Sequence, residues 1–196
     1  KLWKMGLYLQ YDEKFKYEKE IIKILLLHGN KKADFQQLSE EEVSNSKKEY
    51  YSNIVAQEVY LSLQEDEMEF TDTLFQQVYF DVINQLNQEE PIGTDSFINH
   101  ENIEISSLVT NILMDDEKHS LSNWARKEVI VKDVDAELAK MVTDAIFNLR
   151  RVLIDEKIAS LVVKISQESS NESILEEVVD YSELKRKLFK HLNRVI

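Results

Sequence analysis

The sequence predicts an all-α fold that consists of a helical bundle subdomain, a long connecting helix and a C-terminal helical hairpin. Only three glycines and one proline occur among the 196 residues, so the residues that break helices and form tight turns are scarce. Apolar residues recur at helical spacing along most of the chain. No Gly or Pro follows Gly93, so one long helix can extend from Val134 to about Ser166.

The first helix is expected over "YEKEIIKILLLHGN", residues 17–30, where Gly29 or Asn30 supplies the stop. Apolar residues lie on most sides of this short helix, which is typical of a position inside a core. Residues 1–16 are interpreted as a linker or as the remnant of a preceding domain. The chain begins at Lys1 and not at Met, which suggests a piece of a longer protein.

The next two helices are expected to complete much of the bundle. Ser39 and Glu42 stand at capping-box spacing, and the helix that they open is expected to continue through "YYSNIVAQEVYLSL", residues 50–63. The third helix is expected over "TDTLFQQVYFDVINQLNQ", residues 71–88, where apolar residues again recur every three or four positions. Each helix should therefore bury one apolar face.

The segment after Pro91 and Gly93 is more polar. Residues 95–114 are expected to form one or two short helices. Residues 115–133 lack an apolar stripe and are interpreted as a loop with some extended backbone, in which Trp124 packs inward.

The long helix follows Asp133, which is its expected N-terminal cap. Its apolar stripe is interrupted at Glu156 and continues on a rotated face, which indicates a helix that serves two different cores. The serine-rich residues 166–173 should then reverse the chain into the terminal helix. We therefore expect the bundle subdomain at residues 17–154 and the helical hairpin at residues 155–196.

Acidic residues outnumber basic residues, and the formal net charge is -13. The final 63 residues carry 11 acidic and 10 basic residues, so the first 133 carry 26 acidic and 14 basic residues, a net charge of -12. Such a surface repels phosphate backbones, which argues against direct binding of nucleic acid by this part of the chain.

The sequence offers no pattern for catalysis, and we expect no catalytic, cofactor-binding or metal-binding residue. Cysteine is absent, which excludes disulfides, zinc-thiolate sites and thiol catalysis. A glycine-rich phosphate loop and a Gly-x-Ser-x-Gly motif are absent too, as is an apolar stretch long enough for a signal peptide or a membrane span. Asp116 and His119 stand three residues apart, as helical metal ligands can, but the same spacing is common by chance in acidic segments.

The terminal helix differs from the rest of the chain because it is basic and amphipathic. Leu184, Leu188, Leu192 and Val195 recur at helical spacing, and five basic residues accompany them: Lys185, Arg186, Lys187, Lys190 and Arg194. An apolar stripe with a basic rim suits a protein groove that is edged by carboxylates. The alternative is a solvated basic face, which the helix dipole favours near a C-terminus.

Several stretches together resemble the C-terminal helicase-binding domain of bacterial DnaG-type DNA primases, in particular the forms of Bacteroidetes-like bacteria. The similarity extends from about Glu18 to Ile196 and is carried by "EKEIIKILLLHGN", "FTDTLFQQVYFDVI", "LSNW" at Leu121 to Trp124 and the final "LKRKLFKHLNRVI". The family often has Gly before the final Arg-Val-Ile, where this chain has Asn193. Asn tolerates the tight ends of helices well, so this departure changes little.

The resemblance implies a non-catalytic domain that docks primase onto the N-terminal domain of the replicative DnaB-type helicase in the bacterial cytoplasm. The parent protein would be a DNA primase, a nucleotidyltransferase whose zinc and magnesium belong to other domains, and this domain would be a monomer without a cofactor. The residues expected to contact the helicase are Tyr181, Leu184, Lys185, Arg186, Leu188, Phe189 and Arg194.

Two other functions remain open on the sequence. The chain could be an unrelated helical adaptor in which the leucine stripe of the last helix closes a homodimer. It could also be a helical metalloenzyme that uses Asp116 and His119, which would require stoichiometric metal in the purified protein.

Overall fold

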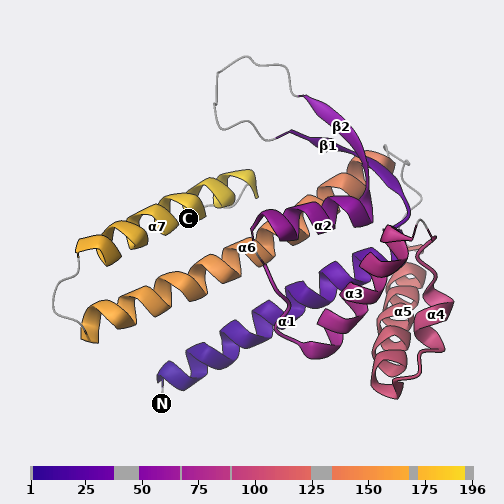
Figure 1. Cartoon of the computed structure of the whole chain (residues 1–196), viewed down its shortest axis with the longest axis horizontal. Coiled ribbons are helices and arrows are strands. Elements are labelled where there is room, and N and C mark those ends of the chain that lie inside the picture. The colour runs from indigo at the N-terminus through magenta and orange to yellow at the C-terminus, as the bar shows by residue number, and fades with distance from the viewer. Residues whose placement is uncertain are drawn as a thin grey trace. The chain divides into compact units, whose positions relative to one another are not determined.

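The computed structural model confirms a predominantly helical fold, drawn in Figure 1. It describes residues 2–37, 49–66, 68–88, 90–124, 134–167 and 172–192, with side chains for residues 13–37, 49–66, 68–88, 90–117, 137–167, 173–190 and 192. The elements are α1 (Leu2–His28), β1 (Lys32–Gln36), β2 (Tyr50–Ile54), α2 (Val55–Glu65), α3 (Thr73–Asn87), α4 (Thr94–Ile98), α5 (Ile103–Trp124), α6 (Val134–Gln167) and α7 (Glu172–His191). Among the described helices, none is both long enough and apolar enough to cross a membrane.

The chain forms two compact units. Residues 19–143 form what we call the central unit, and residues 1–18 with residues 144–196 form the terminal unit. These units divide the chain at other positions than the predicted ranges 17–154 and 155–196, because the first part of α1 packs on the second part of α6.

The core of the central unit is apolar and closed. Its helices contribute side chains with almost no exposed surface, which is the main favourable term in folding. They include Ile21, Ile22 and Leu25 of α1, Val59 and Leu63 of α2, Phe75, Val78 and Val82 of α3, Phe97 of α4, and Ile105, Val109 and Ile112 of α5.

Several predicted helices are confirmed. Helix α3 begins where Asp72 accepts hydrogen bonds from the backbone N–H groups of Leu74 (2.9 Å) and Phe75 (3.1 Å). Two helices, α4 and α5, follow Gly93. Helix α6 is continuous over 34 residues, and α7 follows the serine-rich segment. The expected cap Asp133 lies outside the described residues.

Residues 2–16, which we interpret from the sequence as a linker or the remnant of a preceding domain, belong to α1. This helix has 27 residues, and Gly6 does not interrupt it. Its Glu13 and Lys14 make ion pairs with Arg151 and Glu156 of α6, so tertiary contacts support the helix where apolar periodicity is weak.

The second helix begins later than predicted. Residues 50–54 form β2 instead, antiparallel to β1 in a register that pairs Phe35 with Tyr51. The Phe35 and Tyr51 rings lie 6.1 Å apart between centroids, so an aromatic cross-strand pair stabilises the hairpin. The predicted capping pair Ser39 and Glu42 lies outside the described residues.

The predicted loop at residues 115–133 is wrong for residues 115–124, which continue α5. Lys19 of α1 lies 3.4 Å from Asp115 and Lys23 lies 2.8 Å from Asp116, so the polar turns of α5 are held by ion pairs with α1. Residues 125–133 and the side chain of Trp124 lie outside the described part of the chain.

Candidate functional site

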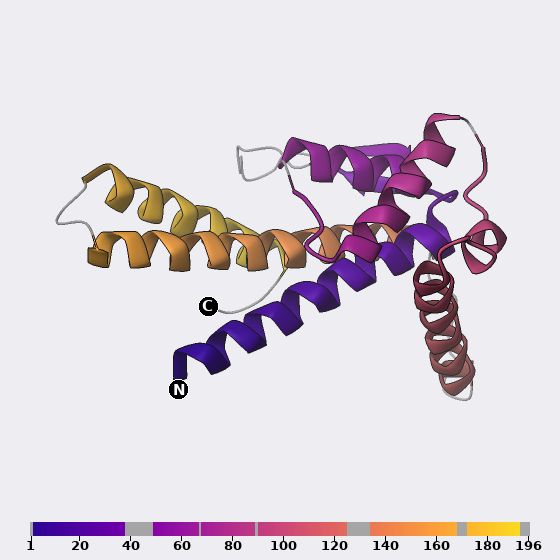
Figure 2. The same cartoon turned by 60° about the horizontal axis from the view of Figure 1, so that its bottom comes forward.

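Helices α6 and α7 form an antiparallel hairpin in the terminal unit, and α7 lies beside the second half of α6 in both views (Figures 1 and 2). The side chains of α7 that face α6 alternate in spacing between four and three residues, as in a coiled coil. They are Ile174, Val178, Tyr181, Lys185 and Leu188, and they oppose Ile154, Ile158, Leu161 and Ile165 of α6. Leu161 and Leu188 are the most buried members of this seam.

Two contacts fix the register of the hairpin. The Lys185 Nζ lies 2.6 Å from Asp155 Oδ1, and the Lys157 Nζ lies 5.7 Å from the centroid of the Tyr181 ring. The Lys185 Nζ also lies 5.7 Å from the centroid of the Phe189 ring. Lys185 therefore holds α7 onto α6 near the open end of the hairpin.

A chain of charges joins the three helices of the terminal unit. The Arg151 Nη2 donates to Glu13 Oε2 of α1 at 3.2 Å, and the Arg151 Nη1 lies 3.6 Å from Asp155 Oδ2. Asp155 in turn binds Lys185 of α7. Charges of alternating sign thus connect α1, α6 and α7 through Arg151 and Asp155.

Among these four charged residues, Arg151 is the most enclosed, with 13% of its side chain exposed. Burial by itself lowers the pKa of the guanidinium, but hydrogen bonds to Tyr17 and Glu13 outweigh burial and raise the pKa above its ordinary value. Arg151 therefore stays charged, and its guanidinium lies 5.8 Å from the centroid of the Tyr17 ring.

The residues that the sequence nominated for partner binding do not form one surface. Tyr181, Lys185 and Leu188 face α6 and are half-buried or buried, while Leu184 and Arg186 are exposed. Phe189 is half-buried beside Lys185. The predicted Arg194 lies outside the described residues. Three of the seven nominated residues therefore pack within the hairpin itself.

Exposed apolar side chains gather elsewhere on the hairpin. Besides Leu184, they are Val162 and Val163 of α6 and Leu175 and Val179 of α7, each about half exposed, from 46% to 58%. The last four flank the turn between the two helices. The sequence contained a signal for them, because α6 and α7 carry more apolar residues in this region than one seam can bury.

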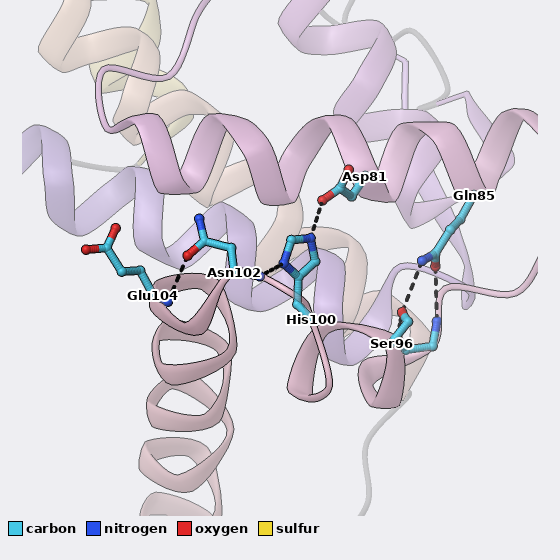
Figure 3. Close-up of polar contacts among 7 residues, drawn as sticks. Asp81, Gln85, Ser96, His100, Asn102 and Glu104 are labelled. Atoms are coloured by element: carbon cyan, nitrogen blue, oxygen red, sulfur yellow. Dashed lines mark hydrogen bonds and ion pairs between the residues drawn. The ribbon is translucent and has the colours of Figure 1, made fainter.

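The central unit holds a second polar cluster, where α3 meets α4 and the start of α5 (Figure 3). The His100 Nδ1 accepts from the Asn102 backbone N–H at 2.9 Å, and His100 Nε2 lies 3.5 Å from Asp81 Oδ2. Gln85 donates to Ser96 Oγ at 3.1 Å and accepts from the Gly93 N–H at 3.3 Å. The Ser96 hydroxyl donates to the Gly93 carbonyl at 2.7 Å.

This second cluster has a structural explanation. The Ser96 hydroxyl donates to a backbone carbonyl. The hydroxyl of an activated nucleophile would donate to a general base instead, so Ser96 is not arranged as a nucleophile. The imidazole of His100 and the side chain of Asn102 each accept a hydrogen bond from the backbone at the start of α5. The cluster therefore anchors α4 and the beginning of α5 to α3.

The metal-site alternative gains no support from the described residues. Asp116 is bound to Lys23, and the side chain of His119 lies outside the described part. Among the described side chains, no three of His, Cys, Asp or Glu are grouped so as to hold a metal ion.

Comparison with known proteins places the chain in a family. No curated protein and no solved structure matches it. The model of one protein family, described as a domain of unknown function and designated DUF8430, matches residues 10–195. Because this match extends over almost the whole sequence, the chain belongs to the DUF8430 family.

Proposed function

We propose that this chain is the non-catalytic docking domain of a bacterial DnaG-type primase, and that its α6–α7 hairpin binds the N-terminal domain of the replicative DnaB-type helicase in the cytoplasm. The observation that carries the proposal is a group of exposed apolar side chains on both helices of the hairpin, namely Val162 of α6 with Leu175 and Val179 of α7. Grouped apolar side chains on a surface are typical of protein-binding sites. The sequence resemblance supplies the identity of the partner.

The charge of the chain favours a protein partner over nucleic acid. The net charge is -13, and the first 133 residues account for -12 of it. Association with a phosphate backbone would bring like charges together, whereas a protein groove can present the complementary charge. Synthesis of primers would belong to the zinc- and magnesium-dependent domains of the parent protein.

Calorimetric titration of the whole chain against the helicase N-terminal domain tests this proposal. We expect micromolar binding by the unchanged chain and its loss in the double variant Leu175→Asp and Val179→Asp. The matched control is Leu61→Asp with Phe80→Asp, because these two residues of the central unit are similarly exposed. The control should bind like the unchanged chain.

Two results would contradict the proposal. One is no binding by the unchanged chain at micromolar concentration, and the other is equal loss of binding in both double variants. The homodimer remains the second function to test, and light scattering distinguishes it. We expect a monomer, because Leu188 of the leucine stripe is already buried within the chain.

A further inference from the structure

The two flanks of the α6–α7 hairpin can be told apart from its register. A residue directly after a position that faces the other helix projects to one flank, and a residue directly before such a position projects to the other. Asp155 follows Ile154, and Lys157 precedes Ile158. We therefore name the two sides the Asp155 flank and the Lys157 flank.

Near the turn, the described side chains of the Asp155 flank carry no charge. Its residues are Ala159, Val162 and Ser166 of α6 and Leu175, Val179 and Ser182 of α7, and all six are exposed. The Lys157 flank of the same region carries Lys157, Lys164, Glu177 and Asp180. Charged residues make up 31% of the chain, so an uncharged flank is a departure, and depletion of charge is typical of the core of an interface.

The polar groups on the Asp155 flank are already satisfied. The Ser166 hydroxyl donates to the Val163 carbonyl at 2.6 Å, and the Ser182 hydroxyl donates to the Val178 carbonyl at 2.6 Å. Covering these serines therefore does not strand a hydrogen-bond donor.

An acidic edge borders this flank on the α7 side. Glu176 follows Leu175 and Glu183 follows Ser182, and both glutamates are exposed. Residues 173–183 contain four acidic and no basic residues. A helix that lies along the flank would thus meet apolar groups along its middle and carboxylates along one side.

We infer that the Asp155 flank near the turn, formed by Ala159, Val162, Ser166, Leu175, Val179 and Ser182, is the docking surface of the hairpin and takes an amphipathic helix with an apolar stripe and a Lys/Arg edge. This inference rests on the proposed function and names the face and the chemistry of its partner. A second copy that paired through the same six residues fits less well, because it would bring its own Glu176 and Glu183 toward those carboxylates.

Two neighbouring valines of α6 provide a matched test. Val162 lies on the Asp155 flank with 52% of its surface exposed, and Val163 lies on the side of α6 away from α7 with 53% exposed. In titrations of the whole chain against the helicase N-terminal domain, Val162→Asp should weaken binding at least tenfold. Val163→Asp should change binding by less than about twofold. Equal losses would overturn the inference.

The acidic edge is tested by Glu176→Gln together with Glu183→Gln. This double variant should bind several-fold more weakly at low salt, and the difference should shrink at high salt because screening weakens the charge pairs. Unchanged or tighter binding at low salt would overturn the assignment of a basic partner edge.

A second probe separates failure of this inference from failure of the proposed function. It is a synthetic helical peptide with a leucine and alanine stripe and lysines along one edge, titrated against the unchanged chain and both valine variants. If the peptide binds, if only Val162→Asp weakens that binding, and if the helicase domain does not bind, then the docking surface is supported and the helicase is rejected as the partner. If neither the helicase domain nor the peptide distinguishes the two valine variants, the Asp155 flank is not the docking surface for such a helix. A dimer of the chain that Val162→Asp dissociates would also contradict the inference.

Discussion

The central unit and the hairpin of the terminal unit use apolar residues in opposite ways. In the central unit, side chains such as Phe75, Ile22 and Val82 are fully enclosed. In the hairpin, one narrow seam holds two helices with help from ion pairs, and valines of similar size remain outside it. The difference teaches that the central unit depends on fully enclosed side chains, whereas the hairpin leaves several apolar side chains exposed around its narrow seam.

The largest effect should come from the enclosed core. Phe75→Ala should lower the free energy of unfolding by about 3–5 kcal/mol, because it leaves a cavity in α3 that neighbours only partly fill. Phe80→Ala is the control on the same helix, where 54% of the side chain is exposed, and it should cost less than about 0.5 kcal/mol. Urea denaturation followed by circular dichroism measures both, and similar losses would refute the contrast.

A smaller effect is expected where α1 meets the segment before α4. A Cβ atom on Gly29 would collide with the Leu25 carbonyl oxygen and lie 2.7 Å from Cδ1 of Ile92. Gly29→Ala should therefore cost about 1–3 kcal/mol through overpacking. Gly93→Ala is the control, since the nearest atom to its new Cβ lies 3.9 Å away. Calorimetric melting should show a lower Tm for the first variant only.

The cap of α3 should matter less than its core. Asp72→Ala removes the acceptor for the Leu74 and Phe75 N–H groups and should cost about 1 kcal/mol. Asp72→Asn keeps an acceptor oxygen and should recover most of the loss. Chemical denaturation of the two variants decides this, and an equal loss in both would show that the side chain does not act as a cap.

The hairpin should respond more weakly and only locally. Lys185→Met removes the ion pair with Asp155, but the side chains are 34% and 25% exposed, so solvent screening limits the loss to below about 1 kcal/mol. Amide hydrogen exchange should become faster in α7 and stay unchanged in α3. The control is Lys187→Met, two residues away on the Lys157 flank, and faster exchange in this variant too would contradict a specific role for Lys185.

The smallest effect that we expect depends on pH and one imidazole of the central unit. Burial lowers the pKa of His28 below its ordinary value of 6.5, nearby Lys31 and Lys23 lower it further, and Asp116 opposes them. Below that value the unfolded chain binds a proton that the folded chain resists, so stability falls as the pH falls toward the folded pKa. Urea titrations from about pH 7 to pH 5 should show less of this loss in His28→Gln.

Most of the helices could be predicted from the sequence. Apolar periodicity and the scarcity of Gly and Pro indicate α3, α6 and α7. The strand β2 and the end of α5 could not be predicted from the sequence. The sequence predicts a helix at Tyr50 and Tyr51, but these residues pair with Gln36 and Phe35 of β1, which lie 14 and 16 residues earlier in the chain. The polar end of α5 depends on Lys19 and Lys23, which lie on another helix and leave no local signal.

The candidate site was predictable at the level of the hairpin but not of its faces. A leucine stripe suggested that Leu184 and Leu188 face the same way, whereas the seam places Lys185 with Leu188 toward α6 and leaves Leu184 exposed. The rotation is set by Asp155, which attracts Lys185 from a position 30 residues earlier in the sequence. Apolar periodicity alone does not report such a polar anchor.

The order of charges along α7 has a consequence for how this end of the chain folds. Residues 173–183 carry four acidic and no basic residues, and residues 184–192 carry Lys185, Arg186, Lys187 and Lys190 without an acidic residue. Negative charge at the start and positive charge at the end of a helix oppose its macrodipole favourably. Helix formation by α7 therefore draws on the order of its own charges as well as on its packing against α6.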